Sequence, residues 1–205
     1  MTESVVTANR PFEIAFTAIG KIIATFARIE SGLYVLYRGY TGLDDAAARA
    51  VIGEPRFSDV SAAIKRLANV RSMDPLVLAG LNEAISRISQ VKRFRDLFAH
   101  RAFHLSEVDG AFSDVVFEEH GFSKNPNANF FVTYTLEELA VIGAECNRLH
   151  LLVDHLDGVI NEDLHPFHLE QPSALQQMRN MPTFPDHRRT QSQLAQPPSS
   201  PSKGR

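Results

Sequence analysis

Apolar residues recur at helical spacing through the first part of the chain. From Pro11 to Tyr37 they follow one another at steps of three, four and seven residues, which places them on one face of a helix. Pro11 suits the first turn of that helix, and Gly42 follows its end. The pattern predicts a long amphipathic helix whose apolar face consists of Phe12, Ala15, Ile19, Ile23, Phe26, Leu33 and Tyr37.

Three more helices are predicted between residues 43 and 98. The first is short, over Leu43–Ile52, and Gly53 marks its end. The second follows Ser58, which is suited to cap a helix, and carries Val60, Ile64 and Leu67. The third starts at Asp74-Pro75 and runs to about Phe98. Its interior apolar residues are Leu78, Leu81, Ile85, Ile88 and Val91.

The last predicted helix follows two short strand-like runs. The runs are Ala111–Phe117 and Phe130–Tyr134, and the turn-forming residues between them predict a hairpin. Thr135 and Glu138 then have the spacing of a capping box, which starts a helix that ends near Val159. Its apolar side consists of Leu139, Ile142, Cys146, Leu149, Val153 and Leu156.

Together these elements predict a mainly α protein, a helical bundle with a small β-hairpin inserted before the last long helix. The 205 residues suffice for one domain and a tail. We expect a flexible N-terminus over residues 1–10, a helical domain over 11–168 and a disordered tail over 169–205, which is rich in Pro, Ser and Gln. The tail is either inert or binds an acidic partner or nucleic acid.

Composition narrows the class of protein. The single cysteine, Cys146, excludes a disulfide framework and fits a reducing cytoplasm. No apolar run is long enough for a membrane span, and the polar N-terminus has no signal pattern, so we expect a cytoplasmic protein that does not interact with membranes. The net charge of −3 hides an uneven distribution, because residues 170–205 carry +3 and the remainder carries −6.

One segment departs from this acidic background. Residues 85–103 contain five basic side chains and only one acidic side chain, Asp96. A locally basic helix face is either a solvated surface or a phosphate-binding site. The five basic residues are Arg87, Lys92, Arg93, Arg95 and Arg101.

Two charges in the chain fall on apolar helix stripes. The stripe that passes through Ile88 and Val91 reaches Arg95, and the stripe of the first helix passes through Glu30. Because an unpaired charge in such a position is costly, we expect a partly buried contact between Glu30 and Arg95. The contact either fixes the register of two helices or orients Arg95 at a site.

His100 follows this arginine closely. Asp96 lies four residues before His100 and would share its helix face, where a carboxylate fixes the tautomer of an imidazole. Arg95 and His100 are about 140° apart around an ideal helix. They can act on one atom only if the helix ends near Ala99, or if two copies of the chain pool their residues across a dimer axis.

The segment Arg95-Asp96-Leu97-Phe98-Ala99-His100 resembles the R-x4-H motif of HEPN domains, in which a polar residue follows the Arg and the His often follows Ala. The resemblance implies a helical bundle that forms a homodimer and brings two Arg95–His100 pairs together. It further implies a metal-independent endoribonuclease without a cofactor, as in toxins and in defence or stress systems. Other members of the family are non-catalytic interaction modules.

The chemistry of RNA cleavage fits these residues. The ribose 2′-OH attacks the neighbouring phosphate, so the enzyme must move protons and stabilise a charged transition state. His100 is suited to proton transfer, and the fork of Arg95 can hold two phosphate oxygens. Asp96 would support His100, and the RNA backbone would follow Lys92, Arg93 and Arg101.

Two other interpretations of the sequence compete with this one. A non-enzymatic helical dimer that binds a protein partner, such as an antitoxin, would also place an Arg–Glu pair in a seam. A metal site would need the histidines near the end of the domain, but no HExxH motif or cysteine cluster supports one, and we predict no metal. These histidines are His150, His155, His165 and His168. We expect the phenylalanines of the helices, and Phe103, to lie in the core.

Overall fold

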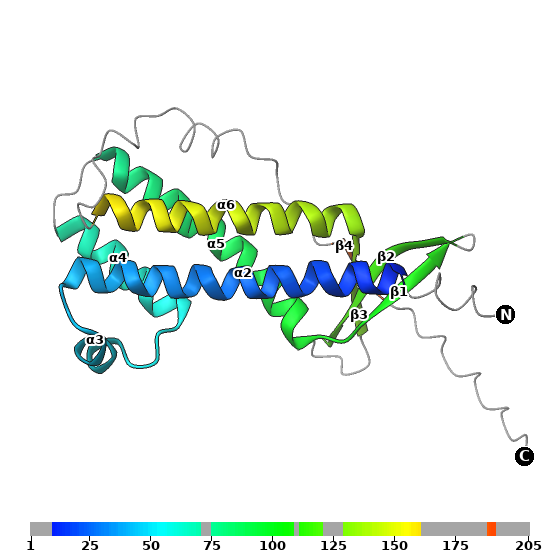
Figure 1. Ribbon diagram of the computed structural model, residues 1–205. Helices are drawn as coiled ribbons and strands as arrows, with labels where there is room; N and C mark the ends of the chain where they lie inside the picture. The colour runs from blue at the N-terminus through cyan, green and yellow to red at the C-terminus, as the bar shows by residue number, and fades with distance from the viewer. Residues whose placement is uncertain (1–9, 71–74, 109–110, 121–128, 161–187, 192–205) are drawn as a thin grey trace, which may run out of the picture.

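The computed structural model describes residues 10–70, 75–108, 111–120, 129–160 and 188–191. It is mainly helical with a small antiparallel sheet, as the sequence predicts (Figure 1). The helices are α2 (Arg10–Thr41), α3 (Asp45–Ile52), α4 (Phe57–Val70), α5 (Pro75–His100) and α6 (Leu136–Ile160).

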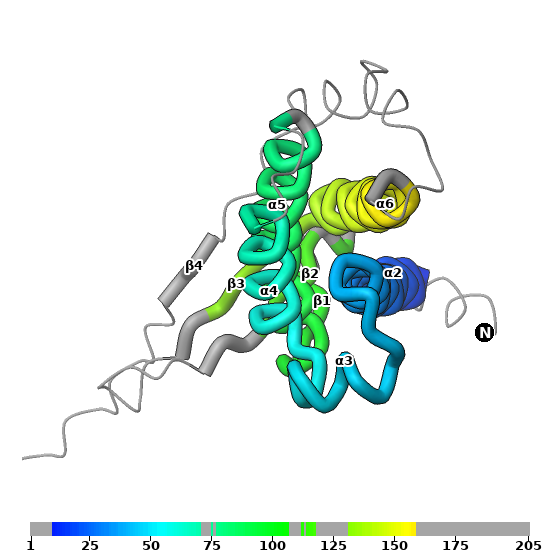
Figure 2. Tube along the Cα trace, turned by 90° about the vertical axis from the view of Figure 1, so that its left-hand side faces the viewer, coloured from blue at the N-terminus to red at the C-terminus, as the bar shows by residue number. Residues whose placement is uncertain are grey.

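The two long helices α2 and α6 lie side by side and run in the same direction (Figures 1 and 2). A Cβ atom added at Gly143 of α6 would lie 3.7 Å from Ile22, and one added at Gly32 of α2 would lie 2.8 Å from Val153. The contacts therefore advance along both helices together. Helices α4 and α5 form a second layer beside this pair, in which α4 packs on α2, and α5 crosses the pair and contacts both α2 and α6 (Figure 2).

The buried face of α2 is displaced slightly from the predicted one. Ile22 and Ile29 are fully buried, whereas Ile23 is only half-buried and Phe12 is 41% exposed. The prediction that Phe12 belongs to the core is therefore wrong. From Ala15 to Leu36, buried residues recur at alternating steps of four and three, which keeps one stripe aligned with α6 and α5. All the buried residues of α2 are Ala15, Ile19, Ile22, Phe26, Ile29, Leu33, Tyr34, Leu36, Tyr37 and Tyr40.

Local signals set the ends of the first helices. Gly42 and Gly53 have φ values of 68° and 73°, a conformation that favours glycine, and follow the ends of α2 and α3. The Asp44 carboxylate accepts a 2.8 Å hydrogen bond from the backbone N–H of Ala47 and so caps α3. Ser58 does not cap α4 as predicted, because the helix already begins at Phe57 and Ser58 lies in its first turn.

The start of α6 confirms the predicted capping box. The Glu138 N–H donates a 3.0 Å hydrogen bond to Thr135 Oγ1, and the Thr135 N–H donates a 2.8 Å bond to the Glu138 carboxylate. All six residues predicted for the apolar side of α6 are buried. The box also turns the chain from the last residue of a strand into the helix.

The predicted hairpin is present and belongs to a larger sheet. Its strands are β2 (Ala111–His120) and β3 (Asn129–Thr135), flanked by β1 (Phe103–Val108) and β4 (Arg188–Gln191) in the antiparallel order β1-β2-β3-β4. Strands β1 and β4 are not predicted from the sequence. Of the predicted disordered tail, only β4 lies within the described residues, where pairing with β3 makes it extended; residues 161–168 of the predicted domain lie outside them.

The sheet lies at the end of the bundle where α2 and α6 begin (Figure 1). The ring of Phe98 near the end of α5 stacks on Phe117 of β2 at 4.8 Å between centroids and meets Tyr134 of β3 edge-on at 5.7 Å. These contacts join the sheet to a single buried core that extends from Ala15 to Leu156. Within the described part of the chain, none of the helices combines the length and apolarity of a membrane crossing.

Replacing Thr135 with Ala should reduce the free energy of unfolding by about 1 kcal/mol, because the Glu138 N–H loses its acceptor at the first turn of α6. Urea denaturation followed by circular dichroism measures the change. Thr17→Ala is the matched control, since Thr17 is an exposed residue in the interior of α2 and should give no loss. Equal stability of Thr135→Ala and the wild type would contradict the role of the cap.

Candidate functional site

The Arg95 and Glu30 side chains are in direct contact, as their positions on the two helix stripes predict. Arg95 Nη2 lies 2.8 Å from both oxygens of the Glu30 carboxylate. The guanidinium carbon also lies 4.8 Å from the centre of the Phe26 ring. With side-chain exposures of 20% for Arg95 and 30% for Glu30, the ion pair is partly shielded from water.

Arg95 lies at the edge of the core rather than within its stripe. The buried residues of this part of α5 are Val91, Phe94 and Phe98, so Phe94 occupies the inner position that the sequence pattern gave to Arg95. The stripe turns by one residue here because Phe94 packs edge-on against Tyr134 of the sheet. Arg95 is thereby left beside the core, with its charged end toward Glu30.

Asp96 has different partners from the predicted one. Its carboxylate binds the Lys92 ammonium group, four residues earlier, and Arg95 Nη1 at 2.9 Å. It makes no contact with His100, so the expectation that Asp96 fixes the tautomer of His100 is wrong. The cause is local: both cations lie on the helix within reach of Asp96, whereas His100 is the exposed last residue of α5.

Four of the nominated residues line one cleft of about 920 Å³: Glu30, Lys92, Arg95 and His100. The cleft lies between α2, the last turns of α5, and the segment that connects α3 to α4. Helix α5 ends at His100, two residues beyond the predicted end at about Phe98, and Arg95 and His100 line the same cleft within a single chain.

The opposite wall of the cleft was not found from the sequence. It includes Arg49 of α3, Glu54, Arg56 and the first residues of α4. The Arg56 carbonyl accepts from the N–H groups of Asp59 and Val60, so the positive end of the α4 dipole adjoins the cleft. No periodicity reveals this wall, because the turns at Gly42 and Gly53 place it there.

Arg49 has two partners at this wall. Its Nε lies 2.9 Å from Asp45, and its guanidinium lies 5.3 Å from the centre of the Tyr34 ring. The Arg49 partner lowers the pKa of Asp45, and the same pairing raises the pKa of Arg49. Burial, followed by the charge of Asp45, raises the pKa of Tyr34, so its phenol stays protonated at neutral pH.

Two nominated residues do not join the cleft. Arg93 is exposed on α5, one residue from Lys92, and it is not among the lining residues. Arg101 follows the end of α5 and donates its N–H to the Leu97 carbonyl at 3.1 Å, and it does not line the cleft either. A role for these two side chains in binding would therefore require a ligand that extends beyond the cleft.

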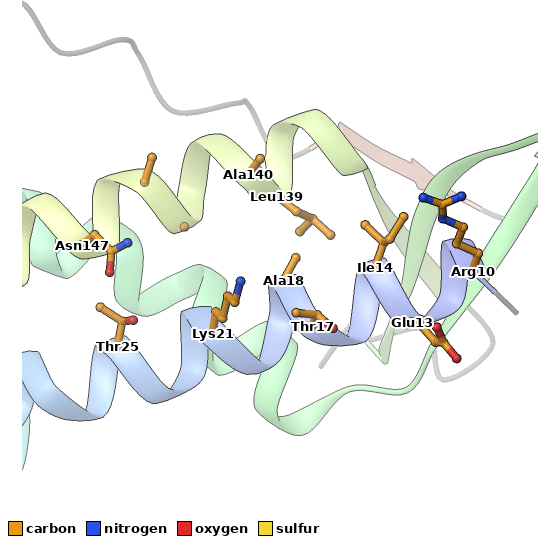
Figure 3. Close-up of a pocket in the computed structure, with 12 residues that line it drawn as sticks. Arg10, Glu13, Ile14, Thr17, Ala18, Lys21, Thr25, Leu139, Ala140 and Asn147 are labelled. Carbon is orange, nitrogen blue, oxygen red and sulfur yellow. The ribbon is translucent and has the colours of Figure 1, made fainter.

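A second groove of about 690 Å³ runs between α2 and α6 on another side of α2 (Figure 3). Small residues form its floor, among them Ala18 and Ala140, and the charges of Arg10, Glu13 and Lys21 lie along it. It contains none of the residues nominated from the sequence. Its side chains offer no arrangement of acid, base and cation comparable with the cleft.

Arg87, the first of the basic residues in the segment, has a structural role. Its Nε lies 2.7 Å from the carboxylate of Glu145, which is 4% exposed. This ion pair joins α5 to α6 inside the bundle, away from the cleft. Next to it, burial and the charge of Glu145 raise the pKa of the Cys146 thiol to about 12.

Of the histidines of α6, His150 contacts a carboxylate of the same helix. His150 Nδ1 lies 3.5 Å from Asp154, its i+4 neighbour. Over the residues that the structure describes, no group of three or more His, Cys, Asp or Glu side chains is arranged to hold a metal ion. His165 and His168 lie outside those residues.

Comparison of the chain with protein-family models, with curated proteins and with solved structures found no match in any of the three. The assignment of a function therefore depends on the chemistry of the cleft.

The Glu30–Arg95 pair should give a measurable coupling in a double-mutant cycle of Glu30→Gln and Arg95→Met. We expect about 1 to 3 kcal/mol from urea denaturation, because the pair is charged, hydrogen-bonded and partly shielded. The exposed pair Asp45–Arg49, with side chains about half exposed, serves as control and should give less than about 1 kcal/mol. A coupling near zero for Glu30 and Arg95 would show that their contact does not persist in solution.

Cys146 should resist iodoacetamide at pH 8 in the folded protein and react once the protein is unfolded in urea. The thiolate is the reactive form, and a pKa of about 12 leaves almost none of it at this pH. Mass spectrometry of the chain gives the labelled fraction without ambiguity, because Cys146 is the single cysteine. Labelling of the folded protein at the rate of a free thiol would contradict its burial.

Proposed function

We propose that the chain is a metal-independent endoribonuclease of the HEPN type, with the cleft between α2, α4 and α5 as its active site. The observation that carries the proposal is that Arg95 and His100 line one cleft within a single chain. A phosphate-binding group and a proton-transfer group thus meet at a surface open to solvent. Metal-independent RNA cleavage needs both kinds of group.

Arg95 retains hydrogen-bonding capacity for a phosphate. Of its five N–H groups, two are directed to Glu30 and one to Asp96, which leaves two donors. Glu30 and Phe26 hold the guanidinium plane in place, so these donors need little reorganisation when a ligand binds. In this proposal Glu30 is a positioning residue for Arg95.

The other cations of the cleft add to the binding of phosphate. Lys92, Arg49 and Arg56 line the cleft with Arg95, against the carboxylates of Glu30 and Glu54. Asp45 and Asp96 pair with three of these four cations. Arg56 has no ion-pair partner among the described residues, and it stands at the positive end of the α4 dipole, so it is the cation most available to an incoming phosphate.

The reaction proposed for this site is a transesterification within the RNA. His100 takes the proton of the ribose 2′-OH as its oxygen attacks the adjacent phosphorus, and the bond from phosphorus to the 5′ oxygen breaks. Arg95 stabilises the charge that builds on the phosphate oxygens. The products are a 2′,3′-cyclic phosphate and a 5′-hydroxyl, and no metal or cofactor takes part.

Protonation of the leaving oxygen requires a second group. In a homodimer, which is part of this proposal, His100 of a second copy supplies it and the two chains share one composite site. His100 is suited to this because it is exposed at the very end of α5. A cytoplasmic setting, where RNA is present and Cys146 stays reduced, completes the proposal.

The alternative function is a non-enzymatic helical dimer that binds a protein such as an antitoxin. The pairing of Lys92 and Arg95 with the carboxylates of Glu30 and Asp96 favours it, since the four charges cancel without a ligand. In that case Arg95 fixes the register of α2 and α5, and its loss would affect folding or partner binding only.

The test is cleavage of mixed structured and unstructured RNA in EDTA by the wild type, His100→Ala and Arg95→Ala. We expect each substitution to lower the rate by about 10²- to 10⁴-fold. Circular dichroism and light scattering establish that the variants keep their fold and oligomeric state. Arg66→Ala, which removes an exposed charge of α4 away from the cleft, is the matched control and should retain the full rate.

The outcomes separate the two functions. Cleavage by the wild type and Arg66→Ala alone, with cyclic phosphate ends, would support the ribonuclease. A well-folded wild type that cleaves no RNA would favour the interaction module. Products with 3′-hydroxyl ends, a strict need for divalent metal, or equal rates in all variants would contradict the mechanism.

A further inference from the structure

Three phenylalanine rings form a cluster on the surface near the start of α2. Phe12 and Phe16 are 41% and 52% exposed, and Phe103 at the start of β1 is half-buried beside them. The ring centroids are 4.9 Å apart for Phe12 and Phe16, 5.2 Å for Phe16 and Phe103, and 5.7 Å for Phe12 and Phe103. We call these three side chains the aromatic patch.

The prediction of core positions is wrong for Phe12 and Phe16, whereas Phe103 packs partly against the core. Phe26, Phe94 and Phe98 are buried, whereas the face of Phe16 remains open to solvent. Exposure of one large aromatic side chain needs no explanation, but a cluster held in mutual contact is a preformed apolar surface. The folding of the domain does not account for its exposure.

The patch lies on the same face of α2 as the cleft. Phe12 precedes Glu30 by 18 residues, and Phe16 precedes Tyr34 by the same number, which is five full turns of an α-helix. The two sites are therefore in line along α2, about 27 Å apart from one pair to the other. The groove of Figure 3 lies on another side of this helix.

The side chains on the surface of α2 between the two sites are small. Gly20 and Ala27, both exposed, lie on this face of α2 together with the half-buried Ile23. A Cβ atom added at Gly20 would have no atom within 4 Å, so packing inside the chain does not require glycine there. Neither Gly20 nor Ala27 has a side chain long enough to obstruct a ligand that lies along this face of α2.

A second route joins the patch to the cleft through the backbone. His100 ends α5, and Phe103, three residues later, begins β1. Three residues span at most about 10 Å, so the imidazole at the cleft and the ring at the patch belong to one short segment. A chain of nucleotides that leaves the cleft past His100 would meet the aromatic patch next.

From this geometry we propose that the aromatic patch is a stacking platform for unpaired bases of the RNA strand whose phosphate lies in the cleft. The inference rests on the proposed function and adds to it a binding site for unpaired bases outside the cleft. Base faces stack on exposed aromatic rings without regard to sequence, whereas the bases of a duplex are already stacked. The small residues of α2 leave room for the backbone between the two sites.

The chain contains no tryptophan, so F16W introduces a single indole reporter into the patch. The substitution is made in the non-cleaving His100→Ala protein, which is titrated with a ten-nucleotide oligoadenylate. We expect the indole emission to be quenched with the same midpoint as binding measured by anisotropy of a labelled oligonucleotide. A ribose-phosphate chain of equal length without bases, and a duplex, should bind without quenching.

Affinity measurements in the same background separate stacking from general apolar contact. Phe16→Ala and Phe16→Leu should each weaken binding of the single strand about tenfold. F16W should bind the strand as tightly as the parent protein does, because only an aromatic ring stacks on a base. Leu151→Ala is the matched control, since Leu151 is 66% exposed on α6 away from both sites, and should bind as tightly as the parent protein.

Four results would overturn the stacking platform. They are RNA binding with unchanged indole emission, equal affinity of Phe16→Ala and its parent, full affinity of Phe16→Leu, and an emission shift that depends on protein concentration without RNA. The last would assign the patch to contact with a second copy. Quenching by RNA with no cleavage by the wild type would refute the ribonuclease and support the platform. Absence of RNA binding in every variant would refute both.

Discussion

Helix α2 lies close against α6 because residue 32 has no side chain. A Cβ atom there would come within 2.8 Å of the Val153 side chain, closer than packed carbon atoms approach, so either that side chain or one of the helices would have to shift. The other contacts of α2 depend on this placement. With α6 on one side, α2 directs Phe26 and Glu30 toward α5, and the same helix carries Phe16 toward the sheet. One close approach thus positions the core, the cleft and the aromatic patch together.

The contact between Glu30 and Arg95 shows how a charge at the margin of a core can serve two purposes. The pair ties α2 to α5 at a point where both helices leave the apolar interior. The Phe26 ring beneath the guanidinium limits its motion to a plane. A rigid guanidinium with two unused donors can fix the register of α2 and α5 and can also bind a phosphate. The other groups of the cleft, above all His100 and Arg56, favour the binding of a phosphate.

Local signals in the sequence were sufficient for much of this structure. The capping box of Thr135 and Glu138 and the stripe of α6 follow directly from spacing, since a helix places neighbours in sequence at fixed angles. The Glu30–Arg95 contact could be predicted because two opposite charges interrupt two apolar stripes. The exposure of Phe12 could not be predicted, because its spacing along α2 is that of a core residue. Whether its side chain is covered depends on the position of the sheet and not on the helix.

The unpredicted parts of the site depend on tertiary placement. Arg49 and Arg56 reach the cleft because the turns at Gly42 and Gly53 fold α3 and the start of α4 back toward α2, and no pattern within these segments encodes the direction of that return. Asp96 was assigned to His100 by helix periodicity alone. Lys92 satisfies the same periodicity, Arg95 is adjacent in sequence, and these cations are the stronger partners for a carboxylate.

The parallel arrangement of α2 and α6 has a consequence for folding during translation. Residues 32 and 153 are in contact although about 120 residues separate them, and all of α3, α4, α5 and most of the sheet is made in between. During translation α2 emerges first, and the part of its apolar stripe that packs on α6 stays uncovered until α6 leaves the ribosome. Such long-range closure slows folding, so a truncated or stalled chain is a natural substrate for chaperones.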